Sequence, residues 1–211
     1  MYLPPLFRED TLQAQHALIR AHPLGLLITA GPGGLMANPV PFVLYDEGER
    51  GVLRVHLARA NPQWREVAAI DSCLTVFQGP QAYITPSWYA TKPETGKVVP
   101  TWNFVTVHAW GKPTVMDDAA WLRRQVDDLT AEREGKRAEP WQVDDAPPDF
   151  VRAQLKAIIG IEIPIERIEG KWKVSQNRPE ADRRGVVEGL REEGGPQDPM
   201  AEIVAARNGL T

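Results

Sequence analysis

Three segments of this chain combine aromatic rings, cationic side chains and short polar side chains, the residue types that bind a planar, partly charged ligand. The first spans residues 81–108, where a strand pattern is interrupted by a proline and a loop and then resumes with strict alternation. Trp88 and Trp102 offer rings for stacking, and Lys97 offers an ammonium group for a phosphate. Asn103 can fix a ligand's orientation. The alternative is a surface hairpin whose tryptophans fold into the core.

The second segment, residues 171–178, follows a strand and places two lysines, a tryptophan and an arginine beside serine, glutamine and asparagine. Lys171 and Arg178 suit a phosphate group. Gln176 and Asn177 can hydrogen-bond the carbonyl and imide edge of a heterocycle. The alternative is a solvated strand end whose charges point outward.

The third segment, residues 56–62, lies at a strand-to-helix junction. Arg59 stands there, where backbone amides and the helix dipole also favour an anion. The alternative is that Asn61 caps the helix and Arg59 is solvated. A haem or metal role for His56 or His108 is less favoured, because the four histidines have no ligand-like spacing. The three segments together favour a ligand site more than any one of them does.

Other chemistries fit the sequence poorly. Ser87 and Ser175 lack the Gly-x-Ser-x-Gly motif of a nucleophile elbow, and Cys73 lies in an apolar run. The chain contains no Gly-x-Gly-x-x-Gly and no phosphate-loop motif, which excludes Rossmann and nucleotide-hydrolase sites. No residue is an evident acid, base or nucleophile, so we expect a binding protein more than an enzyme.

The charge balance argues against a general nucleic-acid binder. The formal net charge is −4 and the pI about 5.6, so any DNA contact must come from a local basic patch. Candidate patches exist, but acidic residues interleave with all of them: Arg123–Arg124, Arg133, Lys136–Arg137 and Arg183–Arg184. A single cysteine, no secretion-signal pattern and no run of transmembrane length predict a cytoplasmic protein without a membrane partner.

Hydrophobic periodicity predicts a mainly β chain with peripheral helices, an α+β protein built on an antiparallel barrel. The expected strands are 24–30, 35–45, 52–58, 73–77, 81–84, 98–115 with a break near residues 111–113, and 160–170. The expected helices are 10–21, a short one after Asn61, 117–134, 148–159 and two within 179–211. We expect one domain over 1–178, with inserted helices at about 117–159, and a helical extension over 179–211.

The chain resembles the PaiB-type family of FMN-binding negative transcriptional regulators. The matching stretches are 1–7, 57–64, 83–89, 97–104, 107–108, 160–163 and 171–178. The resemblance implies an FMN-binding split β-barrel, usually a homodimer with flavin near the subunit interface, and a role in transcriptional repression. DNA binding is implied by the resemblance alone. Two alternatives remain: a flavin-dependent oxidoreductase like pyridoxamine-phosphate oxidases or flavin reductases, and a barrel that has lost the flavin and serves as an interaction module.

The resemblance also implies that the three segments contribute to one cofactor site. Arg59, Lys97 and Lys171 are expected to meet the FMN phosphate, and Trp88 or Trp102 to stack near the isoalloxazine. Asn103, Gln176 and Asn177 are expected to hydrogen-bond the polar edge of the ring. The full predicted cofactor-binding set is His56, Arg59, Asn61, Trp88, Lys97, Trp102, Asn103, Lys171, Gln176, Asn177 and Arg178.

Overall fold

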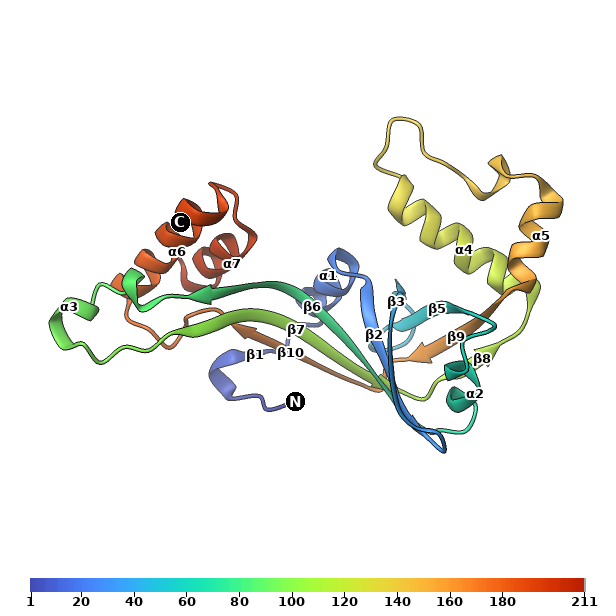
Figure 1. The fold of residues 1–211 in the computed structure, drawn as a ribbon, viewed down its shortest axis with the longest axis horizontal. Helices are drawn as coiled ribbons and strands as arrows, with labels where there is room; N and C mark the ends of the chain where they lie inside the picture. Colours follow the sequence, from blue (N-terminus) through green and yellow to red (C-terminus); the bar gives the residue numbers. More distant parts are fainter. Residues whose placement is uncertain (211) are drawn as a thin grey trace. The chain divides into compact units, whose positions relative to one another are not determined.

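The computed structural model describes residues 1–210, which form an α+β fold with two antiparallel sheets (Figure 1). The first sheet has the strand order β1-β10-β7-β6-β2-β3 and the second has the order β4-β5-β9-β8. The strands are β1 (Arg8–Glu9), β2 (Leu24–Gly31), β3 (Gly34–Pro41), β4 (Val43–Tyr45), β5 (Val52–Ala58), β6 (Cys73–Ile84), β7 (Thr101–Gly111), β8 (Thr114–Met116), β9 (Ile158–Pro164) and β10 (Arg167–Lys173). The predicted antiparallel α+β class is confirmed.

Helices flank the sheets. They are α1 (Leu12–Ala21), α2 (Gln63–Val67), α3 (Lys92–Thr95), α4 (Ala119–Glu134), α5 (Pro148–Lys156), α6 (Glu180–Gly194) and α7 (Pro199–Asn208). Three 3₁₀ turns are η1 (Pro5–Phe7), η2 (Pro86–Trp88) and η3 (Val143–Asp145). None of the helices among residues 1–210 is both long and apolar enough to span a bilayer.

The chain forms two compact units. Of the described residues, unit 1 comprises 1–15, 78–107 and 169–210, and unit 2 comprises 16–77 and 108–168. Strands β6, β7 and β10 contribute residues to both units. The C-terminal helices, expected to be an extension, belong to unit 1.

The core of unit 2 follows from strand alternation. Leu53, Val55 and Leu57 of β5 are buried, and the antiparallel register pairs Val55 with Ile161 of β9. Because successive side chains in a strand point to opposite faces, this pattern places one apolar face inward. Helix α4 packs on β5 and β9 through its buried Trp121.

The core of unit 1 contains the two helices near the C-terminus, where α6 and α7 lie side by side (Figure 1). Their facing apolar residues are buried: Val186, Val187, Leu190, Met200, Ala201 and Val204. Asp198 begins α7 by accepting a hydrogen bond from the Ala201 amide at 2.8 Å, as an N-cap side chain does.

One predicted strand break is absent, and one break was not predicted. A turn was expected at residues 78–80, but β6 runs without interruption from Cys73 to Ile84. The ladder between β2 and β6 ends at Val76, so Pro80 lies beyond the residues of β6 that β2 pairs with, and its fixed φ suits extended backbone. Conversely, the expected strand 35–45 divides at Phe42, whose amide donates to the Pro23 carbonyl, and its two parts join different sheets.

The expected strand 160–170 was also wrong. The chain leaves the second sheet at Pro164 and enters the first at Arg167, so this range holds parts of two strands. Burial continues to alternate through Ile161, Ile163 and Ile165, which is why the pattern resembles a single strand. The amides of Ile165 and Glu166 donate to the carbonyls of Gly51 and Trp110 at the crossing.

Smaller boundary differences remain. Helix α5 ends at Lys156, three residues before the expected end, and β7 begins at Thr101 rather than at residue 98. Asp118, rather than an earlier residue, caps α4 through the Trp121 amide at 2.7 Å. The break near residues 111–113 is confirmed.

Glu9 anchors the last helix to the N-terminal segment of unit 1. Its carboxylate is buried, accepts the Thr11 amide at 2.9 Å and pairs with Arg207 of α7 at 2.7 Å. Burial raises the pKa of Glu9, but the hydrogen bonds from Thr11 and the Arg207 guanidinium outweigh it, so the pKa is lowered. The carboxylate is therefore the form that the fold stabilises.

We expect Arg207→Ala to lower the free energy of unfolding by about 1–3 kcal/mol, because it leaves a buried carboxylate unpaired. The contribution of Glu9 is present above its unfolded pKa and is lost as pH falls through its lowered folded pKa. Arg191→Ala is the control, since its pair with Glu202 is exposed and should matter little. Urea titrations at neutral and acidic pH measure both. Equal destabilisation by the two variants would contradict this role.

Candidate functional site

Unit 1 contains a surface that combines cations with an exposed indole. We call it the cation–tryptophan patch and define it by Lys171, Lys173, Arg178 and Trp102. Side chains two apart on a strand share a face, so β10 presents both lysines together. The Lys171 ammonium lies 5.3 Å from the centroid of the Phe104 ring, and Phe104 shares its face of β7 with Trp102.

Trp102 is the more accessible of the two tryptophans predicted to stack on a ligand. It is 53% exposed, and the Tyr83 ring meets it edge-on with centroids 5.9 Å apart. The edge contact holds the indole without covering both of its faces. Asn103, the next residue, is buried on the opposite side of β7, as alternation requires.

Lys173 lies at the centre of the charge cluster. Its ammonium donates to the Thr101 hydroxyl at 2.6 Å and to the Trp102 carbonyl. Burial lowers the pKa of Lys173, and the neighbouring charges of Lys171 and Arg178 lower it further. Within residues 1–210, no carboxylate forms an ion pair with any of these three cations. The cluster therefore lacks a counterion of its own.

The turn after β10 is held by the predicted polar residues. Asn103 donates from its side-chain nitrogen to the Ser175 hydroxyl at 2.9 Å, and Ser175 has a left-handed φ of 66°. Gln176 accepts the Val174 amide at 2.7 Å and donates to the Trp172 carbonyl at 2.5 Å. Asn103 and Gln176 thus brace the turn that carries Asn177 and Arg178.

The last two predicted residues of this turn face outward to different degrees. Asn177 is exposed, and the Arg178 guanidinium lies 4.4 Å from the centroid of the Tyr89 ring. The Tyr89 hydroxyl is buried without a hydrogen-bond partner, and burial raises its pKa. The Arg178 guanidinium therefore contributes its charge to the patch while it lies over the Tyr89 ring.

Trp88 packs against helix α6. A Cβ atom added to Gly189 would lie 2.3 Å from the Trp88 ring, and one added to Gly185 would lie 2.0 Å from the Trp88 carbonyl oxygen. The neighbouring Thr91 donates from both its amide and its hydroxyl to the buried Asp182 of α6, each at 2.9 Å. These contacts fix η2 and the start of α3 on the helix. Lys97, beyond α3, is exposed.

We expect Gly185→Ala to lower the free energy of unfolding by about 1–3 kcal/mol, because the methyl group has no room against the Trp88 carbonyl. Alanine normally stabilises a helix interior by about 1 kcal/mol relative to glycine. The sign of the change in the free energy of unfolding therefore shows whether the steric contact outweighs this helix preference. Thermal unfolding followed by circular dichroism measures it. Glu188→Ala, an exposed position on the same helix, should change little. A stabilised Gly185→Ala protein would show that the close approach does not constrain α6.

The three predicted residues of unit 2 are engaged in local hydrogen bonds. His56 shares a hydrogen bond of 2.7 Å between its Nδ1 and the Oε1 of buried Gln125. Asn61 accepts the Gln63 amide at 3.0 Å, and α2 begins two residues after it. Arg59 forms a two-bond pair with Asp117 at 3.0 and 2.6 Å. The Arg59 guanidinium lowers the pKa of that carboxyl.

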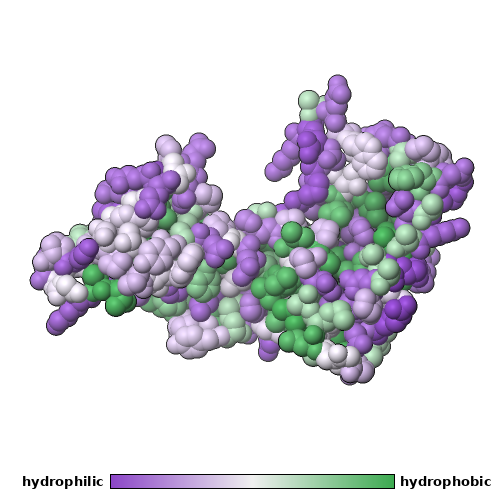
Figure 2. Space-filling model, viewed as in Figure 1, coloured by the Kyte–Doolittle hydropathy of each residue, from purple (hydrophilic) through white to green (hydrophobic). Residues whose placement is uncertain are grey.

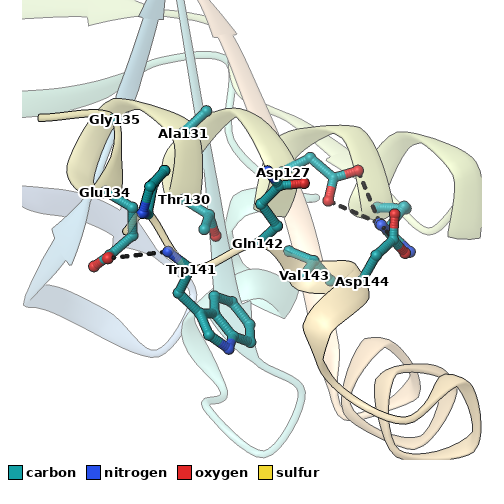
Figure 3. A pocket seen from close by; sticks show the side chains of 11 residues that line it. Asp127, Thr130, Ala131, Glu134, Gly135, Trp141, Gln142, Val143 and Asp144 are labelled. Carbon is teal, nitrogen blue, oxygen red and sulfur yellow. Dashed lines mark hydrogen bonds and ion pairs between the residues drawn. The ribbon is translucent and has the colours of Figure 1, made fainter. Parts of the chain in front are cut away.

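A cavity of about 340 Å³ lies in unit 2 between α4 and the segment 140–144 (Figure 3). Asp127 and Asp144 both pair with Arg123, and Glu134 accepts the Trp141 amide at 3.4 Å. Three carboxylates against one guanidinium would repel a phosphate. The cavity therefore does not fit an FMN phosphate, although an indole borders it.

The candidate DNA patches are largely neutralised. The connection between α4 and α5 is hydrophilic at its surface (Figure 2), but most arginines of the candidate patches form ion pairs. The ion pairs are Arg123 with Asp127 and Asp144, Arg133 with Glu132, Arg137 with Glu134, and Arg184 with Glu180. No group of histidine, cysteine, aspartate and glutamate among residues 1–210 could hold a metal ion.

Sequence reasoning did not select Lys173. The available signal was its two-residue spacing from Lys171 on an expected strand end, which places both ammonium groups on one face. The structure brings Lys173 together with Lys171, Arg178 and Trp102, and it separates Trp88 from this patch by packing it on α6.

Comparison with known proteins identifies the family. Residues 1–167 match the family described as "Putative FMN-binding domain". The chain belongs to this family. It is 32% identical to protease synthase and sporulation protein PAI 2 of Bacillus subtilis, over 97% of this chain and 96% of that one. It is 38% identical to an uncharacterized protein of Emericella nidulans, with 90% of each chain covered.

A solved structure shares the fold. The FAD and haem binding protein of Mycobacterium smegmatis superposes with a TM-score of 0.59 at 15% identity, covering 79% of this chain and 73% of that one. At this identity the likeness concerns architecture alone. The fold is the antiparallel split β-barrel of flavin-binding proteins, as the sequence predicted.

Proposed function

We propose that this protein binds FMN at the cation–tryptophan patch of unit 1. The observation that carries the proposal is a cluster of three cations without a carboxylate partner beside an exposed indole. A phosphate ester supplies the missing negative charge, and the isoalloxazine supplies a planar face for Trp102. Membership in the FMN-binding family supports the same ligand.

Electrostatics explain why the patch would favour a phosphate. Burial and the like charges of Lys171 and Arg178 both disfavour the charged form of Lys173. A bound anion would relieve this unfavourable interaction of the free protein. Binding should therefore raise the pKa of Lys173 and take up protons at alkaline pH. Hydrogen bonds to ionised groups are shorter and stronger than neutral ones. The phosphate would lie among Lys171, Lys173 and Arg178.

The remaining roles follow from exposure. Asn177 is exposed at the turn and is proposed to hydrogen-bond the polar edge of the ring, and Lys97 to approach the phosphate from the loop after α3. Asn103 and Gln176 act through the turn that they brace. When bound, FMN would supply redox chemistry that amino-acid side chains lack. FMN could bind His56, Arg59 or Asn61 only if these side chains gave up the hydrogen bonds that they make within unit 2.

We expect Lys173→Met to weaken FMN binding at least about tenfold, since it removes one ion-assisted contact. Quenching of flavin fluorescence during titration of the full chain measures the affinity. Lys92→Met is the control, because Lys92 is an exposed cation of unit 1 that bonds only to the Ser87 hydroxyl. Wild-type affinity should also fall as pH rises through the lowered pKa of Lys173. FMN affinity unaffected by Lys171→Met and Lys173→Met would remove the patch from consideration.

We also propose that the protein forms a homodimer through unit 1. Five large apolar side chains of this unit are exposed: Tyr2, Leu6, Tyr83, Val99 and Trp102. Exposed apolar surface of this kind is typical of an interface. Sedimentation equilibrium should give twice the chain mass for wild type and a smaller mass for Tyr83→Asp. A wild-type monomer at all concentrations would contradict the dimer.

A regulatory role is supported by kinship with the Bacillus protein, whose name refers to sporulation. Direct DNA contact through the arginine-rich helices gains little support, because Arg123, Arg133 and Arg184 form ion pairs with neighbouring carboxylates. Oxidation of reduced nicotinamide by the FMN-loaded protein would favour the oxidoreductase alternative. Salt-sensitive, sequence-selective retention of DNA would favour a repressor.

A further inference from the structure

A second cavity in unit 2 has a different chemical character from the cation–tryptophan patch. It measures about 260 Å³ and lies where the start of α4, the end of α5 and the segment after β5 meet. Its lining residues are Arg59, Asp117, Ala119, Leu122, Arg152, Leu155 and Lys156. Arg59 is the one lining residue to which the family resemblance assigns a role, at the FMN phosphate.

The floor of the cavity is aliphatic. Leu122 is 3% exposed, Leu155 is half-buried, and Ala119 completes the apolar lining. The lining contains no aromatic ring on which a heterocycle could stack, and no amide side chain to read its edge. An aliphatic chain fits such a floor, whereas a flavin ring does not.

The rim of the cavity is cationic, with three basic side chains against two carboxylates, Asp117 in the lining and Asp149 beside Arg152. Arg59 is held rigidly, because it donates to both Asp117 oxygens and to the carbonyls of Lys156 at 3.1 Å and Ile158 at 2.9 Å. These bonds use four of its five N–H groups. Arg59 therefore shapes the rim and leaves one donor.

The other two cations are available to a ligand. Arg152 pairs with Asp149 of its own helix, and both side chains are exposed, so the pair is readily exchanged. The Lys156 ammonium makes no ion pair or hydrogen bond within residues 1–210. An anionic head group between Arg152 and Lys156 would balance the excess charge of the rim.

We propose that this cavity binds a small amphipathic carboxylate, with its aliphatic chain on Leu122 and Leu155 and its head group at Arg152 and Lys156. The ligand would connect the end of α5 to the start of α4. Because α4 packs on β5 and β9, the bound molecule would stiffen the cover over that sheet. The cavity shares no residue with the cation–tryptophan patch, and neither proposal depends on the other.

Titration of the full chain with octanoate, followed by methyl NMR and calorimetry, tests this proposal. We expect saturable binding, with shifts concentrated at the methyl groups of Leu122 and Leu155. Lys156→Met and Arg152→Met should each weaken binding about tenfold. Lys156→Met should leave the melting temperature unchanged, since Lys156 is exposed and has no partner. Lys136→Met, an exposed cation of the same unit outside the cavity, should bind octanoate like wild type.

Three results would overturn the proposal: octanol binding as tightly as octanoate, affinity unchanged in both cavity variants, or shifts confined to other methyl groups. Saturating FMN should leave octanoate binding unchanged, and displacement by FMN would show one shared site instead of two. A protein that binds octanoate but not FMN would retain this inference while rejecting the proposed function.

Discussion

The hydrogen bond between Asn103 and Ser175 fixes the point at which β10 turns toward α6. Ser175 adopts a backbone conformation that residues other than glycine rarely take, so its surroundings must hold it there. Asn103 does so from the buried face of β7. The direction of the turn then determines where Arg178 lies, and through it the charge cluster with Lys173. One buried polar contact thus positions an exposed cationic surface.

Positive charges are paired with carboxylates over most of the described chain and unpaired in the cation–tryptophan patch. Most arginines of the described chain lie beside a carboxylate, and several do so within one helix turn. Such pairs contribute little to stability, but they remove net charge from the surface. The cation–tryptophan patch departs from this arrangement. An acidic protein can therefore present one locally positive surface without being basic overall.

The sequence allowed the fold class to be predicted because alternation and helical spacing are local properties. The runs around Val55 and Ile161 indicate strands whatever their neighbours are. The point where the chain passes from one sheet to the other depends on distant residues. Apolar and polar residues continue to alternate past Pro164, so the sequence did not reveal the crossing there. Site residues behaved similarly. Residue type selected Trp88 and Trp102 equally, and the structure distinguishes them by the contact of Trp88 with α6 and the exposure of Trp102.

Strand β3 forms one border of the six-stranded sheet and contains Pro39 and Pro41, residues that sheets tolerate at their borders. Its register places Pro39 opposite Leu26 and Pro41 opposite Leu24, so both prolines lie on the same side of the pleat. Neither has an amide hydrogen, so β3 lacks two backbone donors along one of its sides. Prolines on a border strand disfavour pairing with a further strand, and this strand also carries the exposed Leu35.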